Sequence, residues 1–264
     1  AIIALFIWWF STGTILMAVK YADRAGQKAR RNTTLAAFPL MAFGAFGAWW
    51  SASVTDVFGI YVAFLSALSL WGWIEMAFLT GIVTGPNTRP LPNHVTEFER
   101  FNRAWGTLAY HEMLLGATLI CLGVYLWQAA NPFAFYTFAV LFFARVSAKL
   151  NLFLGVPRIH VDFLPAALSH LASHFRIRGL NWLFPISVTA LTFAAACWLE
   201  RLYAADSAGH VTGFALLTAL TALAALEHWV MVLPIPDERL WRWMLPTPKP
   251  TPEQQTNQGG HHGL

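Results

Sequence analysis

Long apolar runs dominate this sequence and decide its class. Seven stretches, each close to the roughly 20 residues that a helix needs to cross a lipid bilayer, are separated by short polar segments. Hydrophobic residues make up 57% of the chain and charged residues only 11%. An ordinary soluble domain has roughly 25% charged residues. The sequence therefore predicts an all-α, polytopic integral membrane bundle of about seven transmembrane helices, in contact with the lipid bilayer.

The expected spans leave little room for a separate soluble domain. They cover residues 1–19, 35–52, 58–83, 104–127, 133–154, 183–199 and 211–233. We therefore expect one transmembrane domain over residues 1–245. Residues 246–264 are rich in Pro, Gln, Gly and Thr, a composition typical of disorder, and we expect them to form a disordered cytoplasmic tail.

The basic residues predict the orientation of the chain. With seven spans, fourteen of the 17 Lys and Arg residues lie in segments that face the same side of the membrane. Cytoplasmic loops carry an excess of Lys and Arg. We therefore place the N-terminus in the periplasm and the C-terminus in the cytoplasm of a bacterial cell. Because these basic residues lie in loops rather than on a soluble face, no nucleic acid partner is expected.

The long connection between the fifth and sixth spans contains a second kind of apolar pattern. Leu164, Leu168, Leu171 and Phe175 recur at helical spacing. This pattern predicts an amphipathic helix near 163–178 on the cytoplasmic surface of the membrane. His170 and His174 lie one helical turn apart there, and we expect them to form a solvated face rather than a metal site.

Ionisable residues inside the apolar spans are the candidates for function. Glu75 is the one charged residue of the third span, and a carboxylate in hydrocarbon costs about 2.5 kcal/mol or more unless protein groups pair with it. Polar residues in three other spans lie at a similar distance from the same membrane face. The predicted polar layer consists of Glu75, His111, Glu112, Arg145, Lys149, Asn151, Glu227 and His228.

Two interpretations of this polar layer remain open. In the first, Arg145 and Lys149 neutralise two of the glutamates, and the layer holds the helices together. In the second, the layer is a site for a metal ion, a proton, a quinone or a tetrapyrrole. The candidate metal ligands are His111, His228, Glu75, Glu112 and Glu227, residue types that bind zinc and iron. The spacing matches neither the Glu-x-x-His pairs of di-iron bundles nor an H-E-x-x-H zinc helix.

Several motifs of the sequence resemble those of a known family. They lie within Trp8–Gly13, Trp71–Gly81, His111–Glu112, Arg145–Gly155 and Glu227–Pro234. With these motifs the chain resembles the PuhE family, photosynthetic complex assembly protein 2 of purple phototrophic bacteria. The resemblance extends from the first span to Trp243.

The resemblance implies a function in photosynthesis. It implies a membrane assembly factor for the photosynthetic reaction centre and core light-harvesting complex, which modulates bacteriochlorophyll supply. The implied partners are reaction-centre and core antenna subunits or bacteriochlorophyll-synthesis enzymes. The implied location is the bacterial inner, intracytoplasmic photosynthetic membrane. The resemblance supplies no catalytic residues, and we expect the chain not to be an enzyme.

Two other functions are kept as alternatives. One is a membrane enzyme or cofactor-binding subunit of bacteriochlorophyll synthesis that uses the intramembrane Glu and His residues. Its candidate cofactors are bacteriochlorophyll, a precursor of it, or a metal ion. The other is a proton-coupled transporter, although the sequence contains no visible inverted repeat.

Overall fold

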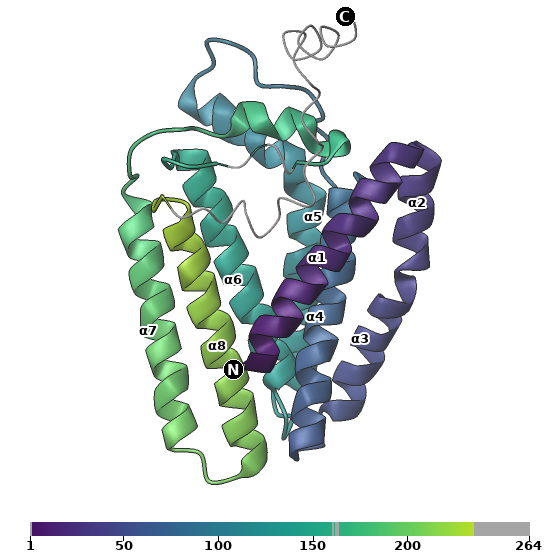
Figure 1. Ribbon diagram of the computed structural model, residues 1–264, viewed down its shortest axis with the longest axis vertical. Helices are drawn as coiled ribbons and strands as arrows, with labels where there is room; N and C mark the ends of the chain where they lie inside the picture. Colours follow the sequence, from purple (N-terminus) through teal and green to yellow (C-terminus); the bar gives the residue numbers. More distant parts are fainter. Residues whose placement is uncertain (1, 160, 162–163, 235–264) are drawn as a thin grey trace, which may run out of the picture.

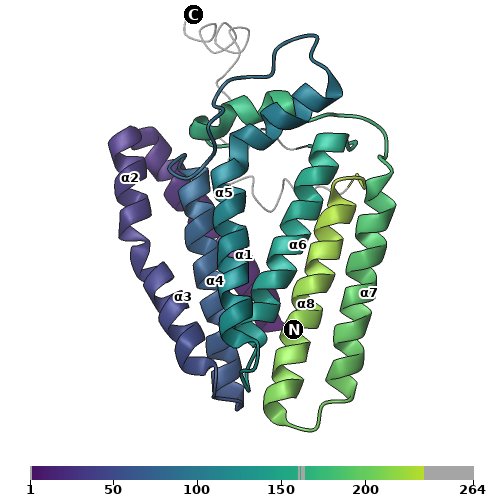
Figure 2. The same cartoon turned by 180° about the vertical axis from the view of Figure 1, so that it is seen from behind.

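The computed structural model describes residues 2–159, 161 and 164–234, and there the chain forms a bundle of long helices (Figures 1 and 2). In this part of the chain, six helices are long and apolar enough to cross a membrane: α1 (Ile2–Ala25), α4 (Val57–Leu79), α5 (Glu97–Leu126), α6 (Phe133–Leu154), α7 (Leu183–Tyr203) and α8 (Ala208–Val230). The prediction of an all-helical membrane protein is confirmed. The predicted tail, 246–264, lies outside the described residues.

The second predicted span consists of two shorter helices. These are α2 (Gln27–Ala36) and α3 (Phe38–Ser51), which meet at Ala37. Pro39 lies in the first turn of α3. Proline has no N–H group and would break a hydrogen bond in the interior of a continuous helix, but in the first turn of a helix that N–H has no partner to lose. At about 1.5 Å per residue, α3 alone measures about 21 Å, less than the roughly 30 Å of the hydrocarbon core. The expected single span is thus a broken one.

Helix α3 packs unusually close to α4. A Cβ atom added to Gly44 would lie 2.6 Å from Leu70 Cγ, and one added to Gly47 would lie 2.2 Å from Ser66 Oγ. Small residues allow such close approach between membrane helices, where van der Waals packing drives association. The two glycines therefore let the broken span lie flat against α4.

Helix α4 lies at the centre of the bundle. It contacts α1, α3, α5, α6 and α8. Its buried Phe64 and Ala67 belong to one apolar core with Phe138 of α6 and Leu217 of α8. The helix that carries Glu75 is thus enclosed by protein, as the cost of a buried carboxylate requires.

The basic connections gather at one end of the bundle. In both views the α1–α2, α4–α5 and α6–α7 connections lie at the same end as the end of α8 (Figures 1 and 2). The Leu91 N–H donates to Ser173 Oγ at 2.9 Å, and the Arg158 N–H donates to the Met231 carbonyl at 3.1 Å. At the opposite end, Asn131 Nδ2 donates to the Val54 carbonyl at 2.8 Å. Arg239, Arg242 and Lys249 lie outside the described residues.

The connection between α6 and α7 contains a short 3₁₀-helix, η2 (Ala166–His174), where the amphipathic helix was expected. In a 3₁₀-helix, residues three apart lie on the same side. Leu168 and Leu171 accordingly share a face, which packs against Phe78 of α4 with Leu108 of α5 beside it. The apolar face of this segment contacts protein, whereas the sequence predicted contact with lipid.

Candidate functional site

Five residues of the predicted polar layer meet between α4, α5 and α6. This group, called the charge layer below, consists of Glu75, His111, Glu112, Arg145 and Lys149. The Glu75 carboxylate is buried and lies 3.4 Å from Arg145 Nε, and Arg145 Nη2 donates to its second oxygen at 3.5 Å. Helix α4 therefore presents its carboxylate to the guanidinium of α6.

Glu112 and Lys149 form the second ion pair of the charge layer. The Lys149 ammonium group donates to the Glu112 carboxylate and lies 5.5 Å from the centre of the Phe78 ring. Arg145 and Lys149 are four residues apart, so both project from one face of α6. Each cation of α6 thus pairs with a carboxylate from a different neighbouring helix.

His111 is fully buried between the two pairs. Its Nε2 lies 3.8 Å from Glu75 Oε1 and 4.0 Å from Glu112 Oε1, distances too long for hydrogen bonds. The ring stacks on Phe78, with 4.3 Å between centroids. Within the described residues neither ring nitrogen has a hydrogen-bond partner. An imidazole held between two carboxylates with both nitrogens unpaired is the unusual feature of this layer.

His228 and Asn151 belong to a different network. His228 Nε2 lies 2.9 Å from Ser147 Oγ, and its Nδ1 lies 2.8 Å from the Ala224 carbonyl oxygen. The buried Asn151 side chain donates to Ser187 Oγ at 2.9 Å. Both side chains therefore have partners on the helices around them, and they connect α6 to α7 and α8.

The structure does not assemble the candidate metal ligands into one centre. Among the residues that the structure describes, no group of three or more His, Cys, Asp or Glu side chains is arranged to hold a metal ion. Both ring nitrogens of His228 already face protein partners. The predicted set of His111, His228, Glu75, Glu112 and Glu227 is thus divided between separate surroundings.

A cavity of about 320 Å³ opens beside the charge layer, between α1, α4, α6 and α8. Glu75 and Arg145 line it together with Glu227, which the Trp8 side chain contacts by a hydrogen bond. The Arg145 side chain remains 45% exposed. Because a guanidinium has five N–H groups, Arg145 can bind Glu75 and still donate into the cavity.

Most of the remaining cavity wall is apolar. Leu16, Leu68, Trp71 and Leu220 lie in it, and α1 adds the hydroxyl-bearing Ser11 and Thr12. An apolar cavity with a few polar groups at one place is typical of sites for small organic molecules. The sequence indicated the polar residues of α4, α6 and α8, but it did not predict that α1 lines the same cavity.

His170 and His174 are buried, which corrects the expectation of a solvated face. Docking of η2 onto α4 and α5 encloses them. Burial lowers the pKa of both imidazoles, because a charged ring loses its hydration there. His174 Nδ1 lies 3.2 Å from the His170 carbonyl oxygen. The apolar stripe was visible in the sequence, but its protein partner was not.

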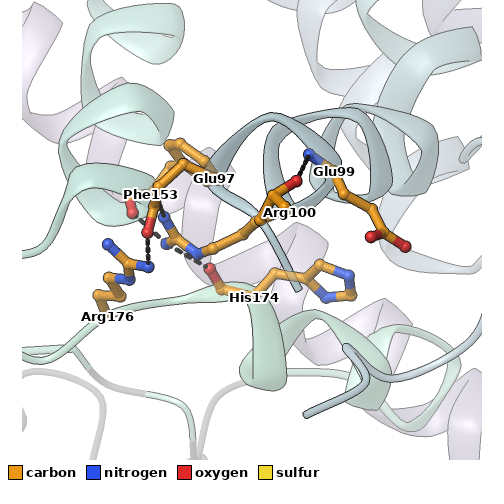
Figure 3. A network of polar contacts seen from close by, with 7 residues as sticks. Glu97, Glu99, Arg100, Phe153, His174 and Arg176 are labelled. Carbon is orange, nitrogen blue, oxygen red and sulfur yellow. Dashed lines mark hydrogen bonds and ion pairs between the residues drawn. The ribbon is translucent and has the colours of Figure 1, made fainter. Parts of the chain in front are cut away.

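A second buried charge lies outside the charge layer, at the basic end of the bundle (Figure 3). The Arg100 side chain, only 4% exposed, donates to the carbonyl oxygens of Phe153 and His174 and to Glu97. Its guanidinium stacks 3.9 Å from the centre of the Phe153 ring, and Glu97 also pairs with Arg176. These five residues, called the Arg100 clamp, join α5 to the end of α6 and to η2. The sequence identified Arg100 only as a basic loop residue.

Comparison with known proteins shows the family of this chain. A protein from Rhodobacter capsulatus, described as an uncharacterized 30.4 kDa protein in the puhA 5′ region, is 53% identical over 247 residues, which cover 94% of this chain and 90% of that protein. No solved structure matches the chain. The model of DUF3623, a protein family of unknown function, matches residues 1–252. The chain therefore belongs to the DUF3623 family.

Proposed function

We propose that this protein is a membrane assembly factor for the photosynthetic reaction centre and core light-harvesting complex, and that it modulates bacteriochlorophyll supply. The observation that carries the proposal is the 53% identical relative, whose description places it in the 5′ region of puhA. The resemblance to the PuhE family supports the same function. The site of action is then the photosynthetic inner membrane of a bacterium.

The bundle offers apolar outer faces to partners within the bilayer. Helix α7 packs mainly on α8, and its Ile186 and Phe193 are exposed on the outside of the molecule. An assembly factor that holds a membrane subunit needs such a lateral surface, because its partner is itself embedded in lipid. Reaction-centre and core antenna subunits are the proposed partners.

The proposed topology has seven crossings, with the N-terminus in the periplasm and the C-terminus in the cytoplasm. It requires α2 and α3 together to form the second crossing, and the close packing of α3 along α4 supports this. Reporter fusions test it directly. A fusion after Lys28 should report the cytoplasm, and a fusion after Asp206 should report the periplasm. The same location for both would refute the seven-crossing topology.

A second candidate function is supported by the cavity beside the charge layer. In this second function, the protein is a cofactor-binding subunit or enzyme of bacteriochlorophyll synthesis. Glu75, Arg145 and Glu227 then contact the bound molecule. The cavity of about 320 Å³ lies at the lower end of the size range of small-molecule sites. The apolar wall and the polar groups at one side suit a largely apolar molecule with a few oxygen atoms.

Gene deletion with complementation tests the first function and separates it from the second. In a phototrophic host, deletion should lower the absorption of reaction-centre and core antenna complexes, and the wild-type gene should restore it. Glu75→Gln keeps the shape of the side chain but removes its charge. At matched protein level, an assembly scaffold should retain most of the pigment–protein complexes with this variant, whereas a cofactor site should lose its activity. Unchanged complexes in the deletion strain would refute both functions.

A further inference from the structure

A second cavity lies at the basic end of the bundle, outside the charge layer. It measures about 230 Å³ and lies between α2, the end of α4, the α4–α5 connection and η2. Its hydrogen-bonding side chains are Gln27, Arg30, Thr80, Thr84, Thr88 and His170. Within the described part of the chain, its wall contains an arginine and no carboxylate. Such a wall favours an anion with several acceptor oxygens.

His170 places a buried imidazole with one unpaired nitrogen in the wall of this cavity. The residue is only 9% exposed, and its buried Nε2 has no hydrogen-bond partner among the residues that the structure describes. Buried polar atoms of native proteins nearly always pair with protein, water or a bound molecule. Because His170 lines the cavity, an oxygen atom inside it can supply the missing partner.

Arg30 is held in place by a carboxylate that does not line the cavity. Arg30 Nε lies 2.6 Å from Asp23 Oδ1, and Asp23 Oδ2 accepts a hydrogen bond from the Ala166 N–H at 2.9 Å. Asp23 thus joins α1, α2 and the start of η2. This ion pair lies on the Nε side of the guanidinium and leaves the terminal N–H groups for a second partner. The planar fork of these groups matches the oxygens of a phosphate.

The position of the cavity indicates where a phosphate would come from. Helix α4 ends at Leu79, directly before the lining residue Thr80, and the exposed Lys28 and Arg31 lie on the same helix as Arg30. The ends of membrane helices lie at the depth of the lipid headgroups. Basic pockets between helices at this depth bind anionic lipid headgroups.

We infer that the cavity between α2, α4 and η2 binds a phosphate group, carried by an anionic phospholipid headgroup or present as free phosphate. Arg30 provides the charge, and His170 with the Thr84 and Thr88 hydroxyls provides further hydrogen bonds. The Thr80 hydroxyl already bonds to Thr34 and to backbone carbonyl oxygens of α4. The bound group would then connect α2 to η2. This inference does not depend on the photosynthetic function proposed above.

Binding to purified full-length protein tests the inference. In lipid nanodiscs, native mass spectrometry should detect one retained phosphatidylglycerol that phosphatidylcholine does not replace. In lipid-free detergent, titration calorimetry with inorganic phosphate tests the other source. Arg30→Gln should weaken binding about tenfold or more, because a charge-assisted hydrogen bond is lost. His170→Leu and Thr88→Val should each weaken it less.

The matched control is Arg31→Gln, which removes the same charge from the same helix but outside the cavity. It should leave retention of the lipid within about twofold of wild type, because an exposed charge is screened by solvent and salt. Thr88→Val changes an exposed residue of a connection, so it tests the cavity even where the Arg30 variant does not fold. Phosphate binding with the same dependence on Thr88 and His170, without lipid retention, would assign the site to free phosphate.

Two results would overturn the inference. One is a wild-type protein that binds neither phosphatidylglycerol nor inorganic phosphate, which would leave the cavity to water. The other is an equal loss of binding for Arg30→Gln and Arg31→Gln together with unchanged binding for Thr88→Val and His170→Leu. That pattern would indicate attraction to the basic end as a whole.

Discussion

The charge layer and the Arg100 clamp each pair an arginine with a carboxylate, but they differ in how many of their buried polar groups have hydrogen-bond partners. In the clamp, Arg100 reaches two backbone carbonyl oxygens and one carboxylate, and an aromatic ring covers it. In the charge layer, Glu75 Oε1 and both nitrogens of His111 have no hydrogen-bond partner among the described residues. In the clamp, His174 Nε2 is the one buried side-chain atom without a partner among the described residues. Paired groups rigidify a fold, whereas unpaired buried groups carry a cost that needs another explanation.

The charge layer and the Arg100 clamp also differ in whether they line a cavity. No lining residue of either cavity belongs to the Arg100 clamp, whereas the charge layer contributes Glu75 and Arg145 to the wall of a cavity of about 320 Å³. The clamp therefore has the properties of a structural joint. The charge layer combines ion pairs that stabilise the bundle with groups available to a bound molecule. Four predictions test this division.

Loss of the clamp should have the largest effect on stability. Arg100→Ala leaves the carbonyl oxygens of Phe153 and His174 buried without donors, so we expect a loss of about 3 kcal/mol in the free energy of unfolding. Unfolding in mixed micelles of mild detergent and dodecyl sulfate measures it. The control is Arg103→Ala, which breaks an exposed pair with Glu99 and should cost less than about 1 kcal/mol. Equal costs would contradict the clamp.

Removal of Arg145 should cost less, about 2 kcal/mol, because its side chain is partly exposed while Glu75 is left buried without its partner. Removing Glu75 as well should recover part of the loss. In a double-mutant cycle of Arg145→Ala and Glu75→Ala, we expect a coupling free energy of about 1 kcal/mol. Strictly additive losses would refute a direct pair.

Substitution by phenylalanine should change the free energy of unfolding differently at the two buried histidines, His228 and His111. His228→Phe removes the partner of Ser147 and of the Ala224 carbonyl and should cost about 1 kcal/mol. His111→Phe retains the stacking on Phe78 and removes two unpaired nitrogens, so stability should change by less than about 0.5 kcal/mol. Comparing these unfolding free energies tests whether His111 is retained for function. A larger loss for His111→Phe than for His228→Phe would show that His111 is a structural residue.

The smallest effect should be a local response to pH at η2. The pKa of His174 is lowered by burial, so the unfolded chain binds a proton more readily than the folded one. The stability contributed by the buried neutral ring is complete above about pH 6.5, the unfolded value, and is lost as the pH falls through the lower folded value. Hydrogen exchange of the backbone amides of 166–174 in lipid-free protein, expressed as protection factors that correct for the intrinsic effect of pH on exchange, should therefore show lower protection on acidification.

His94 provides the control for this response, because it is an exposed histidine of the α4–α5 connection. His94→Leu should leave the pH dependence of the protection factors unchanged, whereas His174→Leu should reduce it. Protection factors at η2 that are independent of pH, or the same response in both variants, would contradict burial of His174 as the cause.

The membrane class, several helix boundaries and the residues of the charge layer were predictable from the sequence. The span 133–154 is observed as Phe133–Leu154, because its flanking Asn131-Pro132 and Gly155 end the apolar run clearly. The cost of a carboxylate in hydrocarbon predicted that Glu75 has a protein partner, but the sequence did not decide between Arg145 and Lys149, and the structure shows Arg145. Similar depth in the membrane, however, does not place residues at the same angle around the bundle. For this reason His228 and Asn151 lie in a separate network, which their depth alone did not predict.

Contacts made by connections were the part that the sequence did not predict. The apolar stripe of η2 was visible, but the pattern of a helix that packs on protein is the same as that of a helix that lies on lipid. Arg100 was indistinguishable from other loop arginines, because its burial depends on carbonyl groups of Phe153 and His174, which are distant in the sequence. The sequence did not predict that α1 lines the cavity beside the charge layer, because this also depends on tertiary packing.

Purification of the tagged protein from phototrophically grown cells tests the central claim most directly. The measurement combines its absorption spectrum, metal analysis and identification of co-purifying proteins after gentle extraction. As an assembly factor, the chain should bring reaction-centre or core antenna subunits with it and carry no stoichiometric pigment or metal of its own. A stoichiometric pigment or metal on a protein that brings none of these subunits would contradict this account and favour the cofactor-binding function.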